Sequence, residues 1–275
     1  MSKPPFITTS WDDGNPADMR VAEMLSRHGL TGTFYVPRSI ETGVMSSPQL
    51  RELAQNFEIG AHTLNHVFLT DVDLPKATDE IAGSKKWVED STGNPCPMFC
   101  PPAGRYKPQH LPIFKKSGYA GIRTVEFMSF DLPRSDKSGL LEMPTTMQAF
   151  SQPVRNYLKN LAKRRAWGNL WRYVVHGRSR DWVVLARNLL DRAAQEGGVF
   201  HLWGHSWELE QTDQWSRLDQ VLKVLGEVTS AGKAACVTNG QLCHHVLARQ
   251  SSDAVIGHAV GNGSRPGPTG AAVGS

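Results

Sequence analysis

Short apolar stretches alternate with amphipathic ones along this sequence, and this alternation restricts its fold more than any other feature. Seven stretches have the pattern of strands, at residues 5–11, 31–36, 58–63, 98–101, 121–125, 198–203 and 234–238. Helical periodicity lies between them, at residues 16–28, 48–56, 75–89, 109–117, 181–195 and 214–228. Strands that alternate with helices pair in parallel through right-handed crossovers. We therefore predict an α/β fold and, at this length, a closed or nearly closed barrel.

Length and composition predict one catalytic domain. The chain has 275 residues, of which 40% are hydrophobic, and a barrel would use nearly all of them. We place the domain at residues 1–250, with a basic helical insertion at about residues 134–180. The tail at residues 251–275 is expected to be disordered, because it is rich in glycine and lacks an apolar period.

Net charge and targeting signals restrict which kinds of binding partner and which cellular location we predict. A net charge of +4 is too small to predict a nucleic-acid partner. No export signal and no apolar run of about eighteen residues occur, which predicts a cytoplasmic protein without a transmembrane segment. The oligomeric state is not indicated. Four cysteines without zinc-ribbon spacing are expected to be reduced thiols, namely Cys96, Cys100, Cys236 and Cys243.

Two short segments carry the residues of a metal centre. Asp12 and Asp13 follow the first strand, where the chain turns at a glycine. His62 and His66 are four residues apart, a spacing that places both rings on one face of a helix or of a strand. Two histidines and a carboxylate form an open hydrolytic metal site, and the second carboxylate remains available as a base. This pattern predicts a metallohydrolase. Zinc is the first expectation for its one divalent metal, although other first-row divalent metals suit the same ligands.

These segments resemble the first two motifs of the polysaccharide deacetylase family, which is carbohydrate esterase family 4 or the NodB-homology domain. Ser-Trp-Asp-Asp-Gly at residues 10–14 is similar to its Thr-Phe-Asp-Asp-Gly motif, and His-Thr-Leu-Asn-His at residues 62–66 to its His-Ser/Thr-x-x-His motif. The resemblance spans roughly residues 5–246. It implies a distorted (β/α)7 barrel and metal-dependent removal of acetyl groups from N- or O-acetylated sugars. By position, the implied metal ligands are Asp13, His62 and His66, and the implied general base is Asp12.

The resemblance also implies a histidine that protonates the leaving amine. The family carries it in a Leu-x-His motif, whereas this chain has Leu202 followed by Trp203, Gly204 and His205. We expect His205 to be the general acid, because it follows the predicted strand. His201 is the alternative, although a buried histidine with satisfied hydrogen bonds needs no function.

The third motif departs from the family pattern. It usually begins Arg-Pro-Pro-Tyr-Gly, and Cys100 stands here in the position of the arginine. We hypothesise that Arg123 supplies the missing positive charge and keeps Asp12 ionised. Arg105 is the alternative.

Four residues beside these motifs are predicted to contact substrate. The aromatic ones could stack on the apolar face of a sugar ring, although large aromatic residues are also common in cores. The four residues are Trp11, Pro102, Trp203 and Trp207.

Residues 151–180 form a basic stretch with eight lysines and arginines and no acidic residue. Large apolar residues are interleaved with the charges. Such a stretch could cover the cleft, bind an anionic glycan or contact a membrane surface peripherally, or it could be a solvated helical face.

The function predicted from these observations is metal-dependent deacetylation of an N-acetylated sugar or glycan precursor. An acetylated saccharide is therefore the expected partner. One alternative is a hydrolase of non-sugar amides on the same fold, as in allantoinase-like relatives. Another is a catalytically idle glycan-binding protein, but such a protein would not need Asp12 as a free base.

Overall fold

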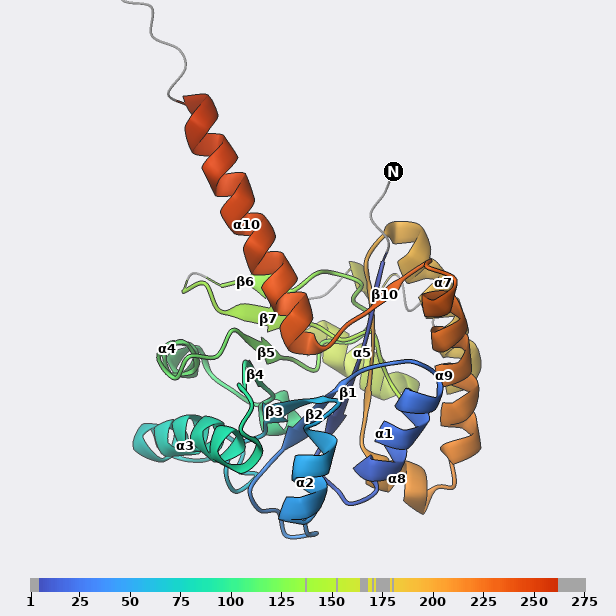
Figure 1. Cartoon of the computed structure of the whole chain (residues 1–275), viewed down its shortest axis with the longest axis horizontal. Helices are drawn as coiled ribbons and strands as arrows, with labels where there is room; N and C mark the ends of the chain where they lie inside the picture. Colours follow the sequence, from blue (N-terminus) through green and yellow to red (C-terminus); the bar gives the residue numbers. More distant parts are fainter. Residues whose placement is uncertain are drawn as a thin grey trace, which may run out of the picture.

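A computed structural model describes residues 5–136, 138–151, 153–163, 168–169, 171, 179 and 181–261 of the chain. One curled sheet lies at the centre, helices cover its outer face, and the last helix projects away from the body (Figure 1). The strand order is β6-β7-β5-β4-β3-β2-β1-β9-β8, and β10 pairs with β1. The architecture is the predicted distorted (β/α)7 barrel.

All seven predicted strands are present. Their bounds are β1 (Phe6–Asp12), β2 (Thr33–Val36), β3 (Glu58–Ala61), β4 (Met98–Phe99), β5 (Gly121–Arg123), β9 (Val199–Gly204) and β10 (Ala235–Cys236). They pair in parallel, as the alternation predicts. Strand β9 follows one edge of β1, while β10 occupies the start of the other edge and β2 its end.

Three strands lie in the segment for which we predicted a helical insertion. They are β6 (Arg134–Ser135), β7 (Leu141–Met143) and β8 (Met147–Gln148). Strand β7 pairs in parallel with β5, and β8 with β9, whereas β6 and β7 are antiparallel. Strands of two or three residues are too short to show a period of two, which is why the sequence pattern missed them.

The six predicted helices are also present. They are α1 (Asp18–Arg27), α2 (Ser47–Leu53), α3 (Leu74–Thr92), α4 (Leu111–Lys116), α7 (Trp182–Glu196) and α9 (Trp215–Ser230). Local capping fixes several starts: Asp73 accepts a hydrogen bond from the Lys76 amide, and Ser46 forms a capping box with Gln49.

Five further elements did not follow from periodicity. They are the 3-10 turns η1 (Pro102–Gly104) and η2 (Pro108–His110) and the helices α5 (Val154–Lys163), α8 (Ser206–Gln211) and α10 (Asn239–Gly261). Helix α5 is the helical part of the predicted insertion. Most of the remaining basic stretch, residues 164–167, 170, 172–178 and 180, lies outside the described residues.

Helix α10 corrects the expected start of the disordered tail. The helix continues through residues 251–261, which contain no proline that would end it. Residues 262–275 lie outside the described part of the chain. The start of α10 is fixed by Glu58, whose carboxylate accepts hydrogen bonds from the Gly240 amide at 2.9 and 3.1 Å.

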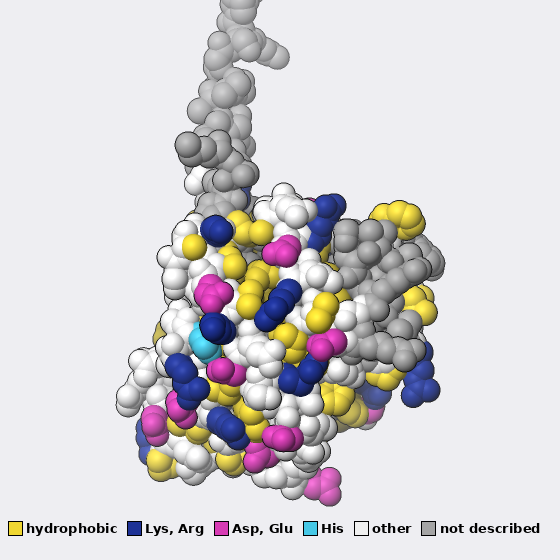
Figure 2. Space-filling view, turned by 90° about the vertical axis from the view of Figure 1, so that its right-hand side faces the viewer, with side chains coloured by type: hydrophobic (Ala, Val, Ile, Leu, Met, Phe, Trp, Pro, Cys, Tyr) yellow, Lys and Arg dark blue, Asp and Glu magenta, His cyan; other side chains and the backbone are white. Residues whose placement is uncertain are grey.

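Two surface features are relevant to partners. No helix in the part of the chain that the structure describes is both long and apolar enough to cross a membrane. On the face that Figure 2 shows, basic and acidic side chains are interspersed rather than gathered by sign.

Helices α7 and α9 pack on each other, and the buried side of α7 yields a stability prediction. Leu189 on α7 is 0% exposed. We expect Leu189→Ala to lower the free energy of unfolding by about 2–5 kcal/mol, because it leaves a cavity. Val184→Ala on the same helix, at a side chain 46% exposed, should change it by no more than about 0.5 kcal/mol. Urea unfolding followed by circular dichroism measures both, and equal losses would contradict this account of the core.

Candidate active site

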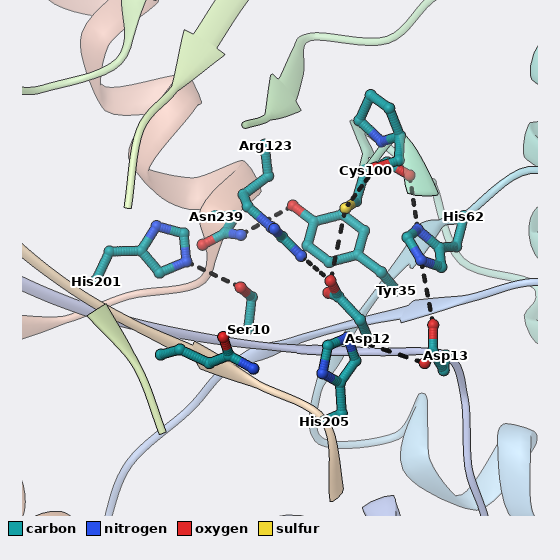
Figure 3. Close-up of polar contacts among 12 residues, drawn as sticks. Ser10, Asp12, Asp13, Tyr35, His62, Cys100, Arg123, His201, His205 and Asn239 are labelled. Carbon is teal, nitrogen blue, oxygen red and sulfur yellow. Dashed lines mark hydrogen bonds and ion pairs between the residues drawn. The ribbon is translucent and has the colours of Figure 1, made fainter. Parts of the chain in front are cut away.

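The chemically active side chains meet at one edge of the sheet. Asp12 is the last residue of β1, Arg123 is the last of β5, and His62, Cys100 and His205 directly follow β3, β4 and β9. Because these strands are parallel, their carboxyl ends lie on the same side of the barrel. The fold therefore brings together residues that are up to 193 positions apart, from Asp12 to His205 (Figure 3).

A pocket of about 580 Å³ opens at this edge. Asp12, Asp13, His62, His66 and His205 all line it. Among the described residues, its other walls include Phe68, Phe127, Gln148, Lys159, Asn160, Trp203, Trp207 and Glu208.

Asp13, His62 and His66 form a group that fits a divalent metal. Their ligand atoms all lie within 4.8 Å of one another. Asp13 Oδ1 is 3.4 Å from His62 Nε2 and 3.0 Å from His66 Nε2. Donor atoms bound at about 2.1 Å around a tetrahedral ion lie about 3.4 Å apart, so these separations suit one ion. Two imidazoles and a carboxylate also leave coordination positions open for water or substrate.

The backbone and neighbouring groups hold these three side chains in place. The Cys100 carbonyl lies 2.6 Å from His62 Nδ1, so this nitrogen donates the hydrogen bond and Nε2 keeps its lone pair. Trp207 Nε1 donates to Asp13 Oδ2 at 2.9 Å. Asp13 and His66 adopt φ of 80° and 52°, conformations that cost about 1–3 kcal/mol each. This strain indicates a site that its surroundings pre-organise.

Gly14 permits the turn after the two acids. Its φ is 62°, and a Cβ at this position would lie 2.6 Å from Cγ1 of Val36. A side chain here would therefore displace either β2 or the turn that carries Asp13.

Asp12, His62 and Cys100 form a second group whose possible ligand atoms lie close together. Two observations disfavour a metal there. The guanidinium of Arg123 already donates to Asp12 Oδ2, so a cation occupies this side of the carboxylate. Burial raises the pKa of the Cys100 thiol well above its usual value, so the sulfur is a protonated, poor ligand.

Asp12 and Arg123 form a buried ion pair, as we hypothesised for the charge missing at Cys100. Arg123 is 0% exposed and Asp12 is 4% exposed. Burial alone would raise the pKa of Asp12, but the charge of Arg123, with smaller effects of His62 and His205, lowers it below the usual value. Asp12 Oδ1 has no hydrogen-bond partner among the described residues. Asp12 is thus an ionised carboxylate with one oxygen available to accept a proton.

Aromatic faces hold the Arg123 side chain from two sides. Its guanidinium carbon lies 4.8 Å from the ring centre of Trp203 and 5.5 Å from that of Tyr35. Cys100 Sγ lies 3.8 Å from Asp12 Oδ2 and completes the surroundings of the pair. A thiol therefore occupies the space beside Asp12, while the positive charge comes from the next strand, β5.

His205 reaches the pocket and has an acidic partner. Its Nδ1 lies 2.7 Å from Glu208 Oε2, and Gln148 Nε2 donates to the same oxygen at 2.6 Å. Burial lowers the pKa of His205, but the bond to Glu208 and the charges of Asp12 and Asp13 outweigh burial and raise it. His205 is thus suited to carry a proton into the pocket.

His201 lies in a buried environment, as expected for a histidine with satisfied hydrogen bonds and no catalytic function. It is 1% exposed and does not line the pocket, and its ring nitrogens contact Ser10 Oγ at 2.9 Å and the Pro144 carbonyl at 3.1 Å. Burial, more than the charge of Arg123, lowers its pKa to about 3, so the ring is neutral.

The structure separates the four predicted substrate contacts into two pairs. Trp203 and Trp207 line the pocket. Trp11 is 0% exposed within the core, and Pro102 is buried beside the pocket without lining it. Arg105, the alternative to Arg123, lies at the surface beside Asp71.

Sequence reasoning missed Glu208, Gln148 and Lys159. Glu208 follows His205 by three residues, a helical spacing that could have identified it as the partner of His205. Gln148 lies on the unpredicted strand β8. Lys159 was recognised only as part of the basic stretch, and the fold shows that α5 brings it to the pocket wall.

The comparison with known families agrees with these motifs. The sequence model described as "Polysaccharide deacetylase" matches residues 2–122, which include Asp12, Asp13, His62 and His66. Residues 2–122 thus match the sequence model of the polysaccharide deacetylase family. The predicted resemblance is thereby confirmed for the part of the chain that carries the first three motifs.

Individual relatives extend the comparison. A peptidoglycan-N-acetylglucosamine deacetylase of Bacillus cereus is 29% identical over 133 residues, which are 47% of this chain and 59% of that protein. The peptidoglycan-N-acetylglucosamine deacetylase of Listeria monocytogenes is 30% identical over 107 residues, 38% of this chain and 22% of that protein. The matches thus span less than two thirds of either relative.

Solved structures show the same fold over nearly the whole chain. A crystal structure from Mycobacterium smegmatis, named as a candidate polysaccharide deacetylase, aligns with a TM-score of 0.67 at 16% identity and covers 91% of this chain and 92% of that one. The peptidoglycan deacetylase structure from Bacillus subtilis aligns with a TM-score of 0.52 at 15% identity, over 92% and 96% of the two chains. At such identities the likeness concerns the fold alone.

The metal group yields a binding prediction. Removal of a residue that only hydrogen-bonds a metal ligand lowers metal affinity by about 10–100-fold. We expect His62→Ala or His66→Ala to lower zinc affinity by at least this factor, because each removes a ligand itself. His28→Ala is the matched control, because this imidazole pairs with Asp219 and does not line the pocket. Titration calorimetry with zinc measures all three variants, and unchanged affinity in the first two would refute the assignment.

The Glu208 contact yields a prediction on turnover. Glu208→Gln should lower kcat by at least about tenfold and leave zinc affinity unchanged. The upper limit of the loss is the effect of a general acid itself, about 10²–10⁴-fold. Glu210→Gln, the same change two residues later on α8, is the control. Acetate release under saturating substrate measures kcat. Equal rates for the two variants would show that Glu208 does not support His205.

Proposed function

We propose that this chain is a metal-dependent hydrolase that removes acetyl groups from an N-acetylated saccharide. The observation that carries the proposal is one pocket lined by a three-residue metal group, a carboxylate with a free oxygen and a histidine paired to an acid. Asp13, His62 and His66 would hold the metal, Asp12 would be the general base and His205 the general acid. Zinc is our first choice of metal.

The chemistry assigns one proton transfer to each group. When bound, the metal would polarise the acetyl carbonyl and lower the pKa of the attacking water. Asp12 accepts the proton of that water at Oδ1, while Arg123 keeps the carboxylate ionised and oriented. His205 donates its Nε2 proton to the leaving nitrogen, and Glu208 stabilises the imidazolium before transfer. The products are acetate and the free amine.

The choice of a saccharide rests on the family and on the pocket walls. The matched relatives from Bacillus cereus and Listeria monocytogenes are named for N-acetylglucosamine of peptidoglycan. Trp203 and Trp207 line the pocket here, and an aromatic ring suits the apolar face of a pyranose.

Acetate release tests the proposal. Zinc- and cobalt-loaded protein should release acetate from N-acetylated oligosaccharides, and Asp12→Asn should lower kcat by about 10²–10⁴-fold, because the amide cannot accept the proton. Asp12→Asn should retain the metal, since Asp12 lies outside the proposed ligand group. Loss of metal in Asp12→Asn would contradict this division of roles.

The two alternative functions correspond to distinct outcomes of the same assay. Turnover confined to non-sugar amides would favour an allantoinase-like hydrolase. Saccharide binding without any acetate release, despite bound metal, would favour a glycan-binding protein.

A further inference from the structure

A second pocket adjoins the catalytic one. Its volume is about 630 Å³, and its own walls include Thr70, Gly104, Arg105 and Tyr106. Three residues, Ala103, Val125 and Asn160, line both pockets. The two hollows are therefore neighbouring parts of one groove, which is longer than a single sugar ring requires.

In the shared wall, Gly104 allows the η1 turn to approach Val125 closely. This glycine has φ of 62°, and a Cβ there would lie 2.4 Å from Cγ2 of Val125. Any larger residue would push Val125 or the η1 turn into the groove. The close approach of η1 to Val125 thus keeps the two pockets connected.

Arg105 is the one cation among the described residues that line the second pocket. Its guanidinium carbon lies 4.4 Å from the ring centre of Phe68, a residue of the catalytic pocket. The nearest acid is Asp71, at 3.7 Å, and both side chains are more than half exposed, at 51% and 58%. An exposed ion pair at this distance contributes little free energy, so Asp71 does not hold Arg105 strongly. Arg105 is therefore oriented by Phe68 and remains available to a ligand.

We propose that the second pocket binds the sugar unit next to the acetylated one, and that Arg105 pairs with a carboxylate on that unit. This inference rests on the proposed function, because it takes the first pocket as the site of the acetylated sugar. A guanidinium offers two parallel N–H donors that match a carboxylate. A dianionic phosphate would call for more donors than one arginine beside an acid supplies.

Binding of two oligosaccharides of equal length tests the proposal. We would titrate metal-loaded protein with a hyaluronan tetrasaccharide, in which glucuronate alternates with N-acetylglucosamine, and with the neutral chitotetraose. A third titration with N-acetylglucosamine 1-phosphate tests a phosphate in place of the carboxylate. Arg105→Gln should weaken hyaluronan binding about fivefold or more and leave chitotetraose binding unchanged. Asp71→Asn should strengthen hyaluronan binding, because it removes the competing acid.

Arg20→Gln is the matched control. Arg20 is 53% exposed, lies 3.5 Å from Glu210 and stacks at 4.3 Å on Trp215, so it repeats the environment of Arg105 away from both pockets. It should change neither affinity. The affinity for N-acetylglucosamine 1-phosphate should be the same with and without Arg105→Gln.

Each remaining outcome overturns the inference. Failure of hyaluronan to bind, equal weakening of both oligosaccharides by Arg105→Gln, or an effect confined to the phosphate compound would each exclude a carboxylate subsite. Because calorimetry needs no turnover, carboxylate selectivity without acetate release would reject the proposed function and keep the subsite. Acetate release without carboxylate selectivity would reject the subsite and keep the proposed function.

Discussion

The ion pair between Arg123 and Asp12 is the contact on which the shape of the site depends. The two residues come from β5 and β1, which are separated in the sheet by β4, β3 and β2. Four steps between neighbouring strands would amount to about 19 Å in a flat sheet. A direct contact therefore requires a curled sheet with both side chains directed into its interior. Because an unpaired buried charge is costly, the pair also opposes flattening of the barrel.

The same pair connects the chemistry to the packing. The Arg123 guanidinium lies over the rings of both Tyr35 and Trp203, and Asp12 precedes the strained turn that begins with Asp13. The position of Asp12, the proposed base, is thus determined by strands on both sides of the pocket. Cys100 fits this arrangement because a small thiol leaves room for the guanidinium that arrives from β5.

Much of this fold could be predicted from the sequence, since long periodic segments encode their own secondary structure. The positions of Asp13 and His62 were also predictable, because each directly follows a strand, and His66 was predictable from its spacing of four residues from His62. Trp11 shows where a simple rule was overlooked. Alternate residues of a strand face opposite sides, so if Asp12 faces the pocket, Trp11 must face the helices. The structure buries Trp11 there, within the core.

Other parts of the site depend on contacts that no local pattern encodes. Strands β6 to β8 are too short to show a period, so the place of Gln148 was not visible in the sequence. The second pocket needs Thr70, η1 and Asn160 of α5 to come together from three separate segments of the chain. Proximity between segments this far apart is a property of the tertiary fold alone.

The two halves of the proposed acid–base machinery differ in how far apart their residues lie along the chain. His205 and Glu208 are three residues apart, so a single helical turn can assemble them. Asp12 and Arg123 are 111 residues apart and meet only when β1 to β5 have formed one curved surface. Contacts of long sequence separation form late, because the intervening chain must first lose its freedom. A partly folded chain would thus possess the proposed proton donor before the proposed base, and competence for the proposed reaction would arrive with completion of the barrel.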